Sequence, residues 1–334
     1  MAELEATPTT RPGAAADLER QLERHRAELT GYCYRMLGSA FEAEDAVQET
    51  LLRAWRSYDR FEGRSALKSW LYRIATNVCL TMLEARGRRA RPVDLGPAGG
   101  LDGALTSLPD GAWIEPVPDD RVVPTEGDPA DLAIARETLR LAFVAALQHL
   151  PARQRAVLIL REVLRWQASE VAELLETSVA SVNSALQRAR ATLADREVTP
   201  TGRRPELDEA DRALLGRYVE AFERYDMDAL VALLHEEATL SMPPYELWLQ
   251  GPDDLRGWFL GIGADCRGSR LVPIVANGSP GFAQYRPSGP GGRHEPWALQ
   301  IIDIADGRVT AINCFLDTAR LFPLFGLGTT PVAA

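Results

Sequence analysis

A stretch between residues 179 and 193 carries side chains suited to reading DNA bases. At helical spacing, apolar side chains fall on one side of it and amide, hydroxyl and guanidinium groups on the other. Asparagine and glutamine can pair with adenine and arginine with guanine, whereas serine and arginine also suit phosphates. A solvated helix face explains the same pattern, so these residues alone leave both readings equally open. The outward residues are Asn183, Ser184, Gln187, Arg188 and Arg190.

Aromatic and cationic side chains alternate through residues 61–77. Bases of single-stranded nucleic acid stack on aromatic rings while cations hold the backbone. The alternative is a structural role, since one of the rings at Trp70 and Tyr72 must be partly buried on a helix with this pattern. The candidates for single-strand contact are Phe61, Arg64, Lys68, Trp70, Tyr72, Arg73 and Asn77.

A third cluster lies in residues 45–55, with the sequence DAVQETLLRAW. Its predicted inward stripe is Ala46, Val47, Thr50, Leu51, Ala54 and Trp55. An apolar leucine among polar outward groups is typical of a protein-docking face, although an ordinary surface helix has the same charges. The outward residues are Asp45, Gln48, Glu49, Leu52 and Arg53.

Helices are the elements that must position these clusters. Apolar periodicity predicts helices over residues 17–89 and again over 132–196. Within the second block, a short helix over 166–175, a turn at 176–178 and a longer helix over 179–193 form a helix-turn-helix candidate.

The remainder of the chain has a different pattern. A helix is predicted over 214–234, and the strands that follow are predicted at 238–242, 271–276, 281–285, 297–304 and 309–315. Asp306-Gly307 is a strong hairpin-turn signal. Helices followed by a run of strands predict a separate α+β domain.

Charge and composition suggest where the domains end. The chain has 334 residues and a net charge of -10, but residues 92–131 alone hold nine acidic side chains and one basic one. Their prolines and glycines predict a linker. We therefore expect a disordered N-terminus at 1–16, helical domains at 17–91 and 132–198, linkers at 92–131 and 199–206, and a final domain at 207–330.

Several classes of protein are disfavoured. The four cysteines are scattered without zinc spacing, so neither a disulfide framework nor a metal or other cofactor is indicated. No apolar run reaches the length of a membrane span, and the N-terminus has no apolar signal core. The expected location is the cytoplasm, without membrane association.

Taken together, the three clusters resemble a known family. In order and in spacing, three segments look like conserved regions two and four of extracytoplasmic-function sigma factors. They are DAVQETLLRAW, FEGRSALKSWLYRIATNVCL and LPARQRAVLILREVLRWQASEVAELLETSVASVNSALQRARATL. The resemblance implies two partners, promoter DNA and core RNA polymerase, the latter through its beta and beta-prime subunits. It also implies that the acidic linker runs through polymerase channels made for nucleic acid. A separate anti-sigma factor is compatible with the sequence.

The resemblance assigns roles to individual residues. The cluster from Asp45 to Arg53 matches the helix that docks on the clamp coiled coil of polymerase. Residues 61–66, which include Arg64 and Ser65, match the loop that captures a flipped base of the minus-ten element, with Asn77 lining that pocket. Lys68, Trp70 and Arg73 belong to the same surface. The outward residues of 183–190 match the minus-thirty-five reader, but Asn183 and Gln187 depart from many relatives, so the sequence read is left open.

Residues 207–330 resemble the SnoaL-like fold, a curved sheet wrapped around a long helix to form a cone with a pocket. Candidate pocket residues are Tyr218, Asp226, His235, Trp248 and Asp317. Some relatives of this fold use such groups as acids or bases, but no spacing here forces them to converge, and structural roles are favoured. We expect a regulatory module, with a small ligand in the cone as one mode of control.

The expected architecture is therefore multi-domain, with two all-α sigma domains followed by an α+β SnoaL-like cone with a curved sheet. The leading hypothesis is a non-enzymatic alternative sigma factor whose last domain modulates its activity. One alternative is a helix-turn-helix regulator that acts without polymerase. The other is an enzyme acting on a small polycyclic or polyketide-like substrate, with a helical appendage.

Overall fold

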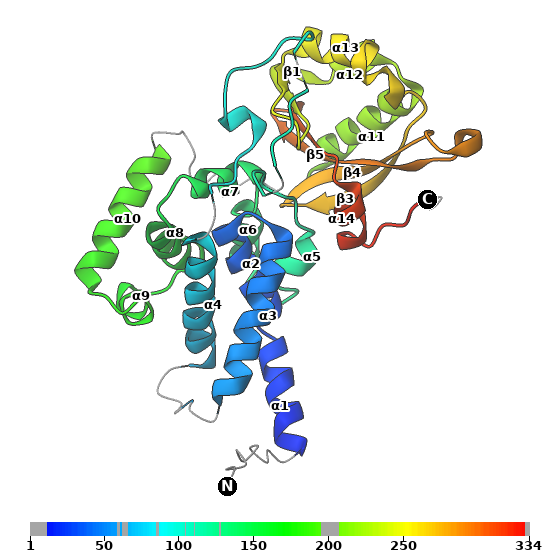
Figure 1. Ribbon diagram of the computed structural model, residues 1–334. Helices are drawn as coiled ribbons and strands as arrows, with labels where there is room; N and C mark the ends of the chain where they lie inside the picture. The colour runs from blue at the N-terminus through cyan, green and yellow to red at the C-terminus, as the bar shows by residue number, and fades with distance from the viewer. Residues whose placement is uncertain are drawn as a thin grey trace.

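The computed structural model describes residues 12–58, 61, 66–84, 87–103, 105–109, 111–126, 128–194 and 207–330. Two helical domains and the linker between them make up the described chain up to residue 194, and a mixed α+β domain follows from residue 207 (Figure 1). Figure 1 shows this C-terminal domain above the helices, with the linker and α14 (Thr318–Leu324) at the junction.

The first helical domain consists of α1 (Pro12–Glu23), α2 (Arg26–Leu37), α3 (Ala40–Ser57) and α4 (Leu67–Glu84). Gly38 ends α2 with a φ of 73°, and the Ser39 side chain begins α3 by accepting a hydrogen bond from the Glu42 amide. The inward stripe of α3 is largely as predicted. Trp55 is the exception, because it is 43% exposed while the neighbouring Ala54 takes the buried position.

The second helical domain contains α6 (Pro129–Glu137), α7 (Leu141–Gln148), α8 (Ala152–Leu158), the π-helical turn η3 (Ile159–Val163), α9 (Ala168–Leu174) and α10 (Val179–Ala194). The predicted helix-turn-helix is present as α9 and α10. Its first helix begins two residues later than predicted, because Arg165 has a left-handed φ of 56° and Glu170 accepts a hydrogen bond from the Gln167 amide.

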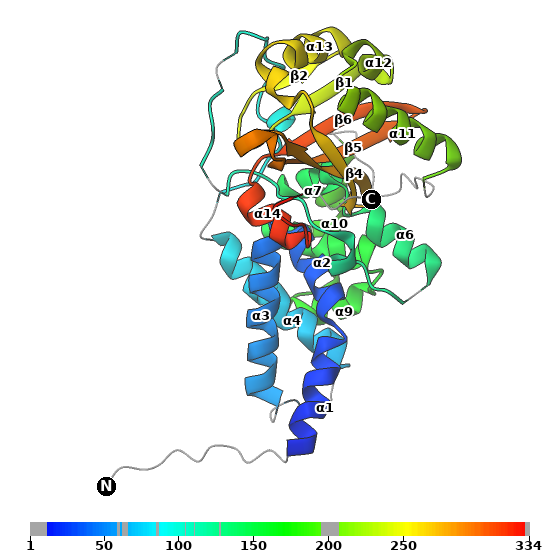
Figure 2. The ribbon, with the colours of Figure 1, turned by 90° about the vertical axis from the view of Figure 1, so that its right-hand side faces the viewer.

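The described linker residues before α6 (92–103, 105–109, 111–126 and 128) pack along the helical domains and the C-terminal domain (Figures 1 and 2). It includes the short helical turns η2 (Pro92–Asp94) and α5 (Asp119–Val122). Isolated bridges join Ala90 to Trp113, Ser107 to Tyr245 and Pro118 to Ala276. Much of the linker is therefore held by contacts with the C-terminal domain.

The C-terminal domain is built on a six-stranded curved sheet with the order β2-β1-β6-β5-β4-β3. Only the β1–β6 pair is parallel, and the sheet is mixed and not closed. The strands are β1 (Leu234–Ser241), β2 (Trp248–Gln250), β3 (Arg270–Ala276), β4 (Ser279–Arg286), β5 (Glu295–Ala305) and β6 (Arg308–Phe315).

Helices cover both faces of this sheet. The helices α11 (Glu209–Arg224), α12 (Met227–Val231) and α13 (Pro252–Leu260) share one apolar core with the strands, and η4 (Ile262–Cys266) follows α13. On the other face, Ala283, Leu299 and Ile301 join α14 and the helical domains in a second continuous core. The sheet is thus buried between its own helices and the rest of the protein.

The single helix predicted over 214–234 is wrong. Tyr225 ends α11 in a left-handed conformation with a φ of 58°, and the Asp226 side chain then accepts a hydrogen bond from Ala229 to begin α12. The strand β1 begins at Leu234, four residues before its predicted start. Local backbone signals at Tyr225 and Asp226 therefore override the apolar periodicity.

Candidate promoter and polymerase surfaces and the interface that joins them

The predicted docking face on α3 is open to solvent. Asp45, Gln48, Leu52 and Arg53 are exposed, and Glu49 is half-buried where it accepts a hydrogen bond from Arg53 at 2.6 Å. Leu52 and Trp55 are each 43% exposed and lie three residues apart, so they fall on neighbouring positions of one helix face. Sequence reasoning missed Trp55 as a surface residue, although a tryptophan next to exposed polar positions could have suggested it.

The described part of the predicted minus-ten surface consists of α4 and Phe61, the first residue of the predicted loop. The Phe61 ring stacks against Tyr58 and lies 4.9 Å from the Trp70 ring. Lys68 pairs with Glu28 at 2.6 Å, and Asn77 is exposed. Tyr72 is fully buried, which makes it the structural ring of the Trp70/Tyr72 pair. Arg64 and Ser65 lie outside the described residues.

The recognition helix α10 has two distinct sides. Its buried residues are Val182, Leu186, Ala189 and Leu193. All five predicted base- and phosphate-contacting residues are exposed on the other side: Asn183, Ser184, Gln187, Arg188 and Arg190. Arg190 also forms an ion pair with Glu162, which leaves its side chain 62% exposed. The helix therefore presents a continuous polar face to solvent.

The two helical domains contact each other directly. The centroid of the Tyr72 ring of α4 lies 5.1 Å from that of the Trp166 ring. The Arg73 guanidinium lies 3.5 Å from the Glu173 carboxylate of α9. The predicted minus-ten helix thus touches the first helix of the helix-turn-helix. We call this arrangement, with the linker and C-terminal domain packed against both helical domains, the closed arrangement.

Two buried arginines tie the helical domains together. Arg35 of α2 donates to Ala135 O at 2.7 Å and to the Thr138 hydroxyl, at the end of α6. Arg155 of α8 donates to Met36 O, near the end of α2. Unpaired carbonyls at helix C-termini attract cations. Burial lowers the pKa of each guanidinium to about 10.

The C-terminal domain is joined to these helices by polar contacts. Arg140 of the second helical domain pairs with Asp303 of β5 at 2.7 Å, with both side chains about four-fifths buried. Arg320 of α14 pairs with Glu115 of the linker at 3.2 Å and lies over the Phe41 ring of α3. A third contact, at Asn277 between β3 and β4, was not predicted, although Asn-Gly at that place is a hairpin signal.

The linker also follows the β2 edge of the sheet. The Trp248 indole donates to Gly96 O at 3.0 Å, and the Gly99 amide donates to Trp248 O at 2.8 Å. Trp113 donates from its indole to Pro244 O at 3.1 Å. Trp248, a predicted pocket residue, therefore contacts the linker.

A chain of polar side chains fills part of the cone interior. The Tyr218 hydroxyl donates to Gln300 at 2.9 Å, Gln300 donates to Gln284 at 2.8 Å, and Gln284 donates to Ser269 at 3.0 Å. Burial raises the pKa of Tyr218 well above its usual value. These groups satisfy one another, so the Tyr218 hydroxyl already has a protein partner.

The structure does not bring the predicted pocket residues together. Tyr218 lies in the cone interior, whereas the half-buried His235 accepts a hydrogen bond from the Glu237 amide on β1. Asp317 is exposed at the start of α14, where it pairs with Arg320, and Asp226 caps α12. Each of these four side chains therefore bonds to a group near it in the fold.

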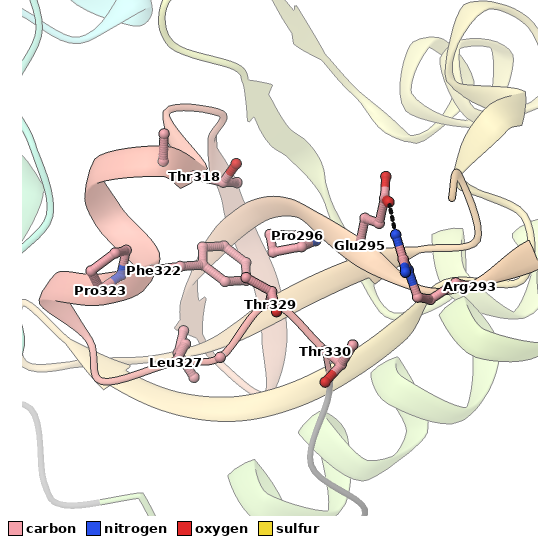
Figure 3. A pocket seen from close by; sticks show the side chains of 11 residues that line it. Arg293, Glu295, Pro296, Thr318, Phe322, Pro323, Leu327, Thr329 and Thr330 are labelled. Carbon is pink, nitrogen blue, oxygen red and sulfur yellow. Dashed lines mark hydrogen bonds and ion pairs between the residues drawn. The ribbon is translucent and has the colours of Figure 1, made fainter. Parts of the chain in front are cut away.

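One cleft of about 620 Å³ lies between α14, the start of β5 and the segment after α14 (Figure 3). Phe322, Pro323, Leu327 and Pro296 give it apolar walls. Figure 3 shows Arg293 paired with Glu295 beside it, at 3.1 Å. It contains none of the predicted pocket residues.

Metal-ligand clusters and membrane-spanning helices are both absent from the described residues. No group of three or more His, Cys, Asp or Glu residues there is arranged to hold a metal ion. No helix in the same part of the chain is long and apolar enough to cross a membrane.

Three family descriptions match the chain in the order of its domains. Residues 22–89 match Sigma-70 region 2, residues 140–193 match Sigma-70 region 4, and residues 215–312 match the SnoaL-like domain. Sigma-70 region 2 followed by Sigma-70 region 4 defines the class of sigma-type initiation factors.

Similar sequences show which family of sigma factors the chain belongs to. The chain is 47% identical to the ECF RNA polymerase sigma factor SigG of Mycobacterium tuberculosis over 93% of this chain and 84% of that protein. It is 26% identical to SigJ of the same organism, covering 87% of this chain and 89% of that protein. The chain belongs to the extracytoplasmic-function RNA polymerase sigma factors, and it acts with core polymerase at promoters as an alternative sigma factor.

The fold has a solved counterpart. The crystal structure of Mycobacterium tuberculosis SigJ matches with a TM-score of 0.59 and 24% identity, covering 94% of this chain and all of that one. The expected order of two helical sigma domains and a SnoaL-like domain is confirmed. The relatives similar along the whole chain are named as sigma factors and not as enzymes.

Proposed function

We propose that three faces divide the work of promoter recognition. The α3 face, with Leu52 at its centre, docks on core polymerase. The α4 surface and its loop take the minus-ten element, and the outward side of α10 reads the minus-thirty-five element. The observation that supports this division is that the α3 and α10 faces are exposed in the closed arrangement while the opposite sides of these helices are buried. On the α4 surface, Asn77 is exposed and Trp70 and Arg73 are half-buried.

We further propose that the C-terminal domain regulates the factor by holding the closed arrangement. The two promoter elements lie about 25 base pairs apart, which is roughly 85 Å at about 3.4 Å per base pair. Helices of 18 and 16 residues, as α4 and α10 are, have lengths of only about 27 and 24 Å. Domains in contact at Arg73 and Glu173 cannot span that distance, so the factor must open to read both elements.

This regulation acts on the arrangement of the domains rather than by covering their faces. Leu52 of α3 and Gln187 of α10 are exposed although the C-terminal domain is docked. The same domain holds the linker along β2, and the linker is the segment proposed to enter the polymerase channels. Opening must therefore release the linker as well as the helical domains.

The C-terminal domain is proposed to be non-catalytic. The Tyr218 hydroxyl, the candidate closest to the cone interior, is bonded to Gln300, and the other candidates are dispersed. A small ligand is not needed to satisfy this interior, because its polar groups bond to one another. We also propose a cytoplasmic location, and a separate anti-sigma factor stays a prediction.

The docking role of α3 can be tested with Leu52→Asp. We expect the affinity for core polymerase to fall tenfold to a hundredfold, roughly the loss when a central apolar contact of an interface is removed. Leu260→Asp is the matched control, because Leu260 of α13 is 46% exposed against 43% for Leu52. Equilibrium binding to core polymerase by fluorescence anisotropy measures both, and equal affinities for the two variants would contradict the proposal.

A further inference from the structure

Asn277, in the turn between β3 and β4, is buried, although the residues of hairpin turns ordinarily face solvent. The turn consists of Asn277 and Gly278, with φ values of 56° and 65°, as a type I′ turn requires. A turn of the same chemistry joins β5 to β6 at Asp306 and Gly307, and that turn is exposed. Burial of Asn277, which is 0% exposed, is therefore not a requirement of the hairpin.

The Asn277 side chain bonds to three segments that are far apart in the sequence. Its Oδ1 accepts a hydrogen bond from the Val117 amide of the linker at 3.0 Å. Its Nδ2 donates to the Tyr34 hydroxyl of α2 at 2.6 Å and to Leu139 O, just before α7, at 2.8 Å. One side chain thus joins the linker and both helical domains, with its oxygen and both amide hydrogens in use.

The backbone of the turn also contacts the linker and α6. The Asn277 amide donates to Val117 O at 3.1 Å, and the Gly278 amide donates to the Asp119 carboxylate at 2.8 Å. A Cβ atom on Gly278 would lie only 2.5 Å from Arg136 O of α6. The turn therefore needs glycine for its approach to α6 as well as for its backbone conformation.

We propose that the Asn277–Gly278 turn is the latch of the closed arrangement, and that its release frees the linker and both helical domains together. Loss of the Asn277 side chain would leave the buried groups that it bonds unpaired, which costs more than the contacts themselves contributed. The Tyr34 hydroxyl extends this network, since it donates to Glu115 O of the linker at 2.8 Å. The inference rests on the proposed regulatory role of the C-terminal domain.

The test uses the full-length chain with Asn277→Gly, which keeps the type I′ turn and removes only the amide side chain. Asp306→Gly is the matched control in the exposed turn. Amide hydrogen exchange at Val117 is the readout, because its acceptor is the Asn277 side chain. We expect protection at Val117 to fall roughly tenfold or more in the first variant and to be unchanged in the control.

A second variant keeps the test independent of a loss of side-chain volume. Asn277→Asp retains the acceptor for Val117 but places a carboxylate oxygen against Leu139 O, so it should also open the junction. Exchange within the β5–β6 ladder reports whether the domain stays folded in each variant.

Three results separate the latch from the proposed regulation. Unchanged protection at Val117 in both Asn277 variants would overturn the latch. Lost protection together with unchanged run-off transcription would keep the latch and reject regulation by the closed arrangement. Altered transcription with unchanged protection would keep regulation and reject the latch.

Discussion

Buried polar side chains have two different roles in the C-terminal domain. Tyr218 and Gln300 bond within the domain and link its long helix to its sheet. Asn277 bonds outward, to groups that belong to the linker and the helical domains. At the residue scale, an inward-facing tyrosine is therefore part of the fold, and the residue that connects the domains is an amide in a turn.

Tyr218→Phe tests the structural role of the interior chain. We expect the free energy of unfolding of the full chain to fall by about 1–3 kcal/mol, because the buried Gln300 oxygen loses its donor. Tyr285→Phe is the control, since the hydroxyl of Tyr285 donates to Gly328 O at a partly exposed edge. Urea unfolding measures both variants, and a loss no larger at Tyr218 than at Tyr285 would contradict this assignment.

At the scale of elements, sequence periodicity and turn signals predicted the features that depend on residues close in sequence. The two sides of α10 and the hairpin turn at Asp306-Gly307 follow from residues close in sequence. The break after α11 was missed, because Tyr225 in a left-handed conformation interrupts an otherwise continuous apolar pattern. Trp55 was assigned to the core on spacing alone, whereas its burial depends on which neighbouring helices reach that position.

The path of the linker could not be predicted for a related reason. Its partners, such as Pro244 and Trp248, lie more than a hundred residues away in the sequence. Composition predicts that such a segment forms few regular elements, but it does not specify the surface against which it packs. Asn277 was missed in the same way, because an Asn-Gly pair predicts a turn and not what that turn contacts.

The α10 helix offers a prediction that separates base reading from backbone binding. Gln187→Ala should weaken binding to one preferred minus-thirty-five sequence by about 1–3 kcal/mol and relax the preference at one base pair. Arg190→Ala should weaken binding of all sequences by similar amounts, as expected for a phosphate contact. Transcription by the reconstituted holoenzyme from a randomised promoter library distinguishes the two, and identical sequence profiles for both variants would contradict the assignment.

At the scale of the whole molecule, three domains and a linker meet at one junction. The junction contains the Arg140–Asp303 pair, the buried Arg35 contacts and the Asn277–Gly278 turn. A regulator that acts here does not need to cover the faces proposed to bind polymerase and DNA. In the proposed mechanism it stabilises the arrangement in which those faces are too close together to fit a promoter, so that polymerase and DNA supply the free energy of opening.

The distance between the helical domains tests most directly whether the factor opens when it engages a promoter. Spin labels at Glu19→Cys and Ala194→Cys would lie on exposed positions outside the three proposed faces, and the four native cysteines are buried. We expect a short distance in the free protein and an increase of several tens of ångströms when core polymerase and promoter DNA are added. An unchanged distance in a complex that initiates transcription would contradict the proposed opening.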